Sequence, residues 1–185
     1  EEEELNFLGN KLSQEYGAKS PLEAAKYIGN SDTYSLKVLS RIYMNLTTQQ
    51  AGEILVKANN EEFTNELFKT IREEEVLLGI PESSTVEIAS IMTFLNEYNK
   101  KIDDLVIVYE KMAANEAAKA IEKLLENRQE VTVFTMQNDN PGYTLSDYKV
   151  AVEIMKKMKK PKLSKILSNM TPEQVAQITK ILAIE

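Results

Sequence analysis

The stretch from residue 150 to residue 182 constrains the fold of this chain more than any other. Its apolar residues recur at spacings of three and four, which is the period of an amphipathic α-helix. The period is interrupted at Thr171-Pro172-Glu173-Gln174, where an N-cap residue precedes a proline suited to the first helical turn. Gln174 completes a capping box with Thr171. The stretch therefore predicts short amphipathic helices joined by tight corners.

The same unit occurs three times along the chain. Alignment of the chain with itself, without gaps, pairs an apolar helix, a four-residue corner and a pair of small residues in each copy. The residue that ends the first helix and the small pair that follows it are, in the three copies, Leu46 with Ala51 and Gly52, Met112 with Ala117 and Ala118, and Met170 with Val175 and Ala176. We expect a neighbouring helix to pass close to each small pair, because repeated helical units bury their apolar faces by stacking.

Composition agrees with an all-α protein. Of the 185 residues, 43% are hydrophobic and 28% are charged, and there are six Gly, five Pro and no Trp, which suits helices better than a β-sandwich. Apolar periodicity and caps predict helices over 1–16, 20–28, 36–46, 47–58, 61–71, 83–95, 105–112 and 115–125. Residues 98–101 either bend or continue the helix before them.

The segment from Val131 to Met136 is the ambiguous part of the pattern. Its β-branched residues suit a strand, but Phe134 aligns with Phe68 of the first copy, in a region rich in helix formers. We prefer the helical interpretation and keep the strand as the alternative.

Gly79-Ile80-Pro81 is the strongest break in the first half of the chain. We place a domain boundary there, with one helical repeat in residues 1–80 and the other two in residues 81–185.

The residue types limit the chemistry that is available. The chain contains no His and no Cys, which removes thiol and imidazole catalysis, structural zinc and disulfides. We therefore expect no enzyme, no catalytic residue, no cofactor and no metal site. The acidic runs that could be considered for Mg²⁺ are Asp103-Asp104, Glu61-Glu62 and Glu73-Glu74-Glu75. Helix N-terminal charge and solubility explain the first two equally well.

Charge singles out the last third of the chain as a candidate binding surface. The net charge of −7 argues against general nucleic-acid binding, but bases outnumber acids after residue 130. Six lysines fall within ten residues that contain no acid: Lys156, Lys157, Lys159, Lys160, Lys162 and Lys165. They could dock an acidic partner or anionic headgroups, whereas the competing interpretation is a solvated helix face.

The C-terminal half also resembles a known family. The pattern I-x-x-x-M-T-P-E-Q-x-A-x-x-T-x-x-L begins at Ile166, and it is preceded by E-I-M-K-K-M-K and by V-Y-E-K-M-x-x-x-x-A-A-K-A-I. These patterns resemble the MgtE N-terminal domain superfamily, nearest to its MotE-like flagellar branch. The lysine- and asparagine-rich character is similar to the FlbB-like periplasmic collar proteins of spirochaetes. Residues 33–71 are similar in pattern to the armadillo-like modules of FliG rotor proteins.

The resemblance implies a fold and a set of functions. The fold would be a right-handed superhelix of helix–corner–helix units, as in armadillo, FliG and MgtE N-terminal modules. The function would be a non-catalytic scaffold or chaperone that binds flagellar motor proteins of the stator or collar, with an oligomer compatible with that role. The alternatives are a magnesium-sensing domain of an MgtE-type transporter and a FliG-like rotor component.

The compartment depends on which of these functions holds. The chain would be periplasmic and membrane-anchored in the FlbB-like or MotE-like case, through an anchor removed ahead of Glu1, and cytoplasmic in the other two. No apolar run in the sequence itself reaches the roughly 20 residues needed to cross a bilayer.

Overall fold

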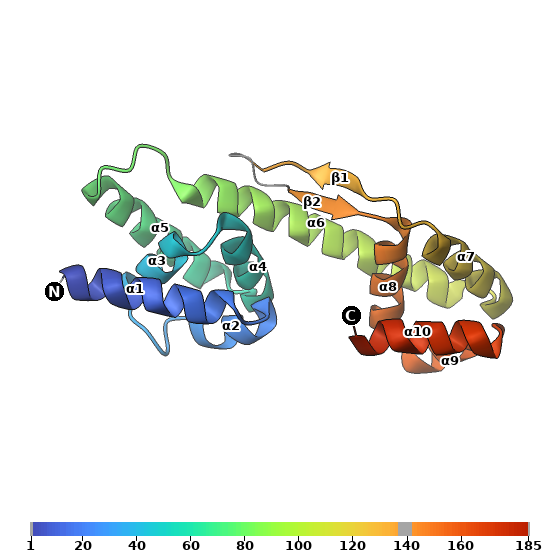
Figure 1. Cartoon of the computed structure of the whole chain (residues 1–185). Coiled ribbons are helices and arrows are strands. Elements are labelled where there is room, and N and C mark those ends of the chain that lie inside the picture. The colour runs from blue at the N-terminus through green and yellow to red at the C-terminus, as the bar shows by residue number, and fades with distance from the viewer. Residues whose placement is uncertain (1, 137–141, 185) are drawn as a thin grey trace. The chain divides into compact units, whose positions relative to one another are not determined.

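The computed structural model describes residues 2–136 and 142–184, and it is 76% helical (Figure 1). The helices are α1 (Glu2–Gly17), α2 (Pro21–Ile28), α3 (Leu36–Asn45), α4 (Thr48–Ala58), α5 (Glu61–Leu77), α6 (Ser84–Lys111), α7 (Ala114–Glu126), α8 (Asp147–Lys157), α9 (Lys160–Leu167) and α10 (Pro172–Ile184). The strands are β1 (Val131–Phe134) and β2 (Tyr143–Leu145). The all-α prediction is confirmed in that the described residues are mostly helical, and residues 98–101 continue the helix as part of α6.

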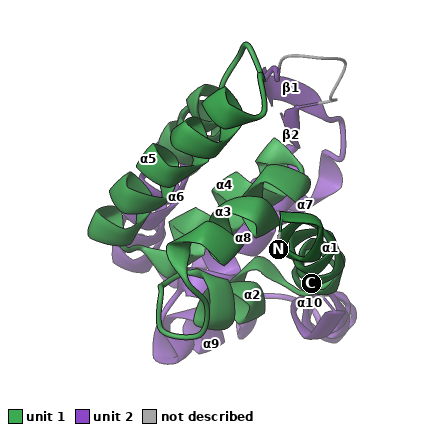
Figure 2. Cartoon of the chain, turned by 90° about the vertical axis from the view of Figure 1, so that its left-hand side faces the viewer, with its two compact units in different colours: residues 1–96 green, residues 97–185 purple. Residues whose placement is uncertain are grey.

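The chain divides into two compact units, residues 1–96 and residues 97–185 (Figure 2). The division falls within α6, so this helix contributes residues to both units. Gly79-Ile80-Pro81, where a domain boundary is expected from the sequence, lies in the connection between α5 and α6, inside the first unit.

Alternate helices pack together in the first unit: α1 against α3, α2 against α4, and α3 against α5. Leu39, Ile42 and Tyr43 of α3 are buried because helices cover them from more than one side. The hydroxyl of Tyr43 donates a 2.8 Å hydrogen bond to the carbonyl oxygen of Ile28, so the polar end of this buried ring is satisfied. Helix α3 is thus the centre of the unit.

A charged side chain lies inside this packing. Arg41 of α3 is only 3% exposed, and its guanidinium group pairs with carboxylates of Glu2 on α1 and Glu74 on α5. A Cβ at Gly9 would lie 2.6 Å from Cβ of Arg41, so α1 can approach α3 this closely only because residue 9 is glycine. Both helices that cover α3 therefore supply an acid to its buried base.

The end of α5 is joined to the start of α6 by a side chain. Oε1 of Glu75 accepts hydrogen bonds from the backbone nitrogen of Ser84 at 2.9 Å and from its hydroxyl at 2.7 Å. This carboxylate satisfies one of the unpaired amides that every helix leaves at its N-terminus. The buried Glu75 is thus a structural residue.

The second unit is built around α7, which packs against α8 and α9. Its buried core combines the C-terminal part of α6 with α7 to α10. The residues of this core are Ile102, Val106, Ala117, Ala118, Ile121, Ile154, Met155, Met158, Ile166 and Ile178.

The preferred helical interpretation of Val131 to Met136 is wrong. Residues 131–134 form β1, which pairs antiparallel with β2, and Val131 lies opposite Leu145. Phe134 packs against Tyr143 with ring centroids 6.2 Å apart, and Gly142 beside it has a φ of +71°. Contacts between β-branched and aromatic side chains across the two strands stabilise this pairing. The pattern of residues 131–136 taken alone does not reveal these contacts.

The expected helix starts are found at the three aligned corners, and the capping box predicted for Thr171 and Gln174 is confirmed. Thr47 and Gln50 form a reciprocal capping box at the start of α4, and Thr171 and Gln174 form the same pair of hydrogen bonds at the start of α10. The N-cap residue of α7 is Ala113, which makes no side-chain cap hydrogen bond. The helix starts therefore agree in all three copies, although the middle copy lacks the cap.

The small pairs are buried in two copies only. A Cβ at Gly52 would lie 2.6 Å from Cγ2 of Ile91, and Ala117 and Ala118 are both fully buried. In the third copy Val175 is half-buried and Ala176 is exposed, so the prediction that a helix passes close to this pair is wrong for the described residues.

One aligned apolar position also fails. Val108 of the second copy is 52% exposed, whereas its counterparts Ile42 and Ile166 are buried. At this position, burial is therefore shared by the first and third copies and not by the second.

Candidate functional site

The six predicted lysines lie at the junction of α8 and α9. Lys156 and Lys157 form the last turn of α8, Lys159 is the N-cap residue of α9, and Lys160, Lys162 and Lys165 lie on α9. All six are exposed. The structure therefore brings together the whole predicted cluster, which we call the lysine junction.

The lysines differ in how they affect their helices. Lys156 and Lys157 lie at the negative end of the α8 dipole, where a cation is favourable by roughly 0.3 to 1 kcal/mol. Lys159, Lys160 and Lys162 lie at the positive end of α9, where a cation is unfavourable by a similar amount. Charges at the start of α9 thus oppose the stability of that helix.

Two acids of α6 reach the lysine junction. Nζ of Lys157 lies 2.8 Å from Oδ1 of Asp103, and Oε1 of Glu110 accepts a 2.8 Å hydrogen bond from the backbone nitrogen of Lys159. Among the described residues, the other five side-chain ammonium groups have no carboxylate within ion-pair distance. Within the part of the chain that the structure describes, Lys157 is therefore the one lysine of the junction that a carboxylate neutralises.

The acidic runs have other roles in the structure. Glu61 and Glu62 lie in the first turn of α5, as expected for favourable helix N-terminal charge, but Asp103 lies within α6 and pairs with Lys157, so helix-end charge does not explain it. Glu74 and Glu75 are buried and paired structurally. Within the described residues, no group of three or more potential metal-ligating side chains is close enough to hold an ion.

A groove runs beside the lysine junction, between α9 and α10. It has a volume of about 720 Å³, and apolar side chains form most of its lining. The lining includes Lys160, Leu163, Leu167, Met170, Val175 and Ala176. Met170, Val175 and Ala176 belong to the repeat signature, whose small pair is buried in the first two copies. The sequence therefore identified these residues but not that they line an open groove.

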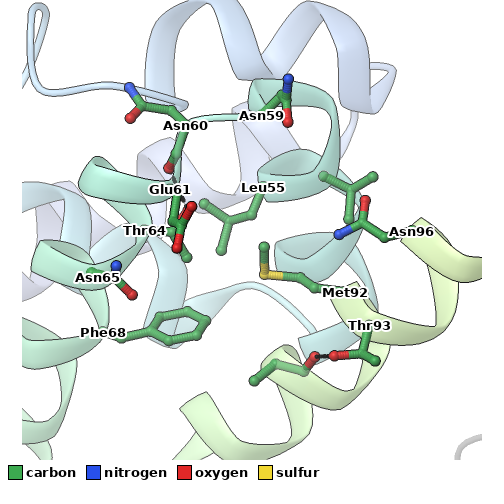
Figure 3. A pocket seen from close by; sticks show the side chains of 12 residues that line it. Leu55, Asn59, Asn60, Glu61, Thr64, Asn65, Phe68, Met92, Thr93 and Asn96 are labelled. Carbon is green, nitrogen blue, oxygen red and sulfur yellow. Dashed lines mark hydrogen bonds between the residues drawn. The ribbon is translucent and has the colours of Figure 1, made fainter.

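A separate cavity of about 340 Å³ lies in the first unit, between the end of α4, the start of α5 and α6 (Figure 3). Figure 3 shows Phe68 and Met92 directed toward its centre, with asparagine and threonine side chains around them. Oδ1 of Asn60 accepts a 3.1 Å hydrogen bond from the backbone nitrogen of Phe63, and Thr64 donates to the carbonyl oxygen of Asn60. Two of the polar side chains in the lining thus serve to start α5.

No helix among the described residues is both long and apolar enough to cross a membrane.

Comparison of the chain with protein-family models, with curated proteins and with solved structures gives no match.

Proposed function

We propose that this chain is a non-catalytic protein–protein interaction module that acts through the lysine junction. The observation that carries the proposal is the concentration of exposed lysines at the start of α9, where they oppose the helix dipole and where five of the six lack a carboxylate partner in the described chain. A partner with acidic side chains would neutralise them. Clustered charge of this kind mainly accelerates association, and apolar contacts then set the lifetime of the complex.

The setting that we propose is the bacterial flagellar motor, in which the chain would be a scaffold or chaperone of the stator or collar. The proposal is supported by the resemblance of residues 105–184 to MotE-like proteins. The helix–corner–helix units, with matching helix starts at Thr48, Ala114 and Pro172, are compatible with the right-handed superhelix that this resemblance implies.

The test is capture of motor components by the purified chain and by a charge variant. Replacement of Lys156, Lys157, Lys159 and Lys160 by Gln removes four charges and keeps helix propensity similar. We expect the variant to fold normally and to capture less stator or collar protein from a lysate of the source bacterium. The difference should shrink as the salt concentration rises, because salt screens exposed charges.

A matched control carries the same change in charge elsewhere. Lys100, Lys101, Lys119 and Lys123 are exposed in the same unit, and their replacement by Gln should leave capture unchanged. Equal capture by the parent and the Lys156 to Lys160 variant would contradict the proposal. Recovery of transporter subunits or of rotor proteins, in place of stator or collar proteins, would instead support one of the two alternative functions.

A further inference from the structure

The cavity of the first unit combines an apolar floor with a rim of polar side chains (Figure 3). Leu55 of α4 is 1% exposed, and Phe68 of α5 and Met92 of α6 are half-buried beside it. The residues that line the cavity all belong to the first unit. Its volume of about 340 Å³ falls within the range of small-molecule sites, which is about 300 to 1,000 Å³.

The rim is rich in side-chain amides that the fold does not use. Asn59 ends α4, Asn65 lies on α5 and Asn96 lies on α6, so the three amides approach the cavity from three helices. Among the described residues, these amides make no hydrogen bond with another part of the chain. Asn65 and Asn96 stand inside helices, where Asn is a poorer helix former than Ala. Neither amide therefore has a local structural role.

The charge of the cavity limits the ligands that it can hold. Of the described residues in the lining, Glu61 is the one acid, and none is a base. Glu61 lies in the first turn of α5, where the positive end of the helix dipole offsets its charge. A phosphate or carboxylate group would find no Lys or Arg to pair with. The cavity is therefore suited to an uncharged ligand.

We propose that this cavity binds a small neutral saccharide. A carboxamide has two donors and an acceptor, so it can pair with a hydroxyl group in either direction. A pyranose ring carries hydroxyl groups around its edge and C–H groups on its faces, which matches a rim of amides around the floor of Phe68 and Met92. The site is separate from the lysine junction and does not depend on the proposed protein-binding function.

Titration of the isotope-labelled full chain with sugars, followed by proton–nitrogen correlation NMR, tests the proposal. The probes are glucose, galactose, mannose and N-acetylglucosamine, with adenosine for comparison. Asparagine side chains give their own signals in these spectra. At least one sugar should shift the signals of Asn59, Asn65 and Asn96 saturably, with the Kd of about 1 mM expected for so small a ligand. A phosphate ester of that sugar should bind several-fold more weakly, because its charge would lose water without gaining a base.

Single substitutions separate binding from folding. Asn65→Ala and Asn96→Ala should each weaken binding roughly fivefold, the effect of one lost hydrogen bond, and leave the fold intact because Ala favours helices. Asn59→Gly should do the same, since glycine accepts the φ of +48° at this position. Asn99→Ala is the matched control: Asn99 lies on α6 outside the lining, and this variant should bind like the parent.

Three results would overturn the proposal. The first is the absence of saturable shifts with all four sugars at about 50 mM. The second is an affinity that Asn65→Ala and Asn96→Ala leave unchanged, because the shifts would then arise elsewhere. The third is tighter binding of adenosine than of any sugar, because the rim would then recognise the fixed donor and acceptor pattern of a nucleobase edge.

Discussion

Nε of Arg41 donates a 3.0 Å hydrogen bond to Oε2 of Glu74, and this buried pair joins α3 to α5. Removal of one member leaves the other charge buried without a partner, which costs about 3 to 5 kcal/mol. We therefore expect Arg41→Met to lower the free energy of unfolding by that amount in urea denaturation. Lys165→Met, at the aligned exposed position, should change it by less than about 0.5 kcal/mol.

A double variant distinguishes the charge from the packing. Arg41→Met with Glu74→Leu removes both charges, and it should recover most of the stability that Arg41→Met loses. A double variant as unstable as the single one would show that the arginine acts through packing.

Ala118 and Ala176 stand at the same position of two repeats, the first buried and the second exposed. Ala118→Leu should overpack the core of the second unit at a cost of about 1 to 3 kcal/mol. Ala176→Leu should melt close to the parent in a thermal scan, because its side chain enters an open groove. Equal melting of the two variants would contradict the difference in burial.

Ala113 is an N-cap residue with extended backbone and without a side-chain cap, and Glu116 stands three residues after it. Ala113→Ser would complete a capping box like those at Thr47 and Thr171. We expect a gain of about 0.5 to 1 kcal/mol in the free energy of unfolding. Thr171→Ala should lose a similar amount, and chemical denaturation of the two variants checks both signs.

Burial, and then the negative charge of Glu153, raise the pKa of Tyr98 to about 12. An unfolded tyrosine has a pKa of about 10, so between about pH 10 and pH 12 the unfolded state has lost a proton that the folded state keeps. The contribution of Tyr98 to stability is therefore complete below about pH 10 and falls as the pH rises. Tyr98→Phe removes this dependence.

Urea denaturation at a series of pH values tests this pH dependence. The difference in unfolding free energy between the parent and Tyr98→Phe should be constant up to about pH 9. It should then shift in favour of the variant by less than about 1.4 kcal/mol per pH unit. A constant difference up to about pH 11 would show that Tyr98 titrates normally.

The helices and their corners could be predicted from local sequence because their causes are local. The capping box of Thr171 and Gln174 depends on residues three apart, and so does the apolar period that follows it. The strand at Val131 to Phe134 could not be predicted in this way, because it depends on pairing with Tyr143 to Leu145, a separate segment of the chain.

The positive charge of the lysine junction could be predicted from the sequence, but the residues of other helices that contact it could not. The six lysines are adjacent in the sequence, whereas Asp103, which neutralises Lys157, lies in another helix. Whether Ala176 is exposed depends on packing between helices, which the repeat pattern does not contain. That pattern predicts burial for Ala118 and for Ala176 alike, but only Ala118 is buried.

The carboxylate of Glu75, by holding both the backbone and the hydroxyl of Ser84, fixes the two ends of the α5–α6 connection to each other. Within that connection, Leu78 and Ile80 are exposed, and a Cβ at Gly79 would meet no atom within 4 Å. The span between the fixed ends can therefore change in length with little effect on the helices. This connection is where the chain can be opened to create new termini, or interrupted to carry a reporter domain.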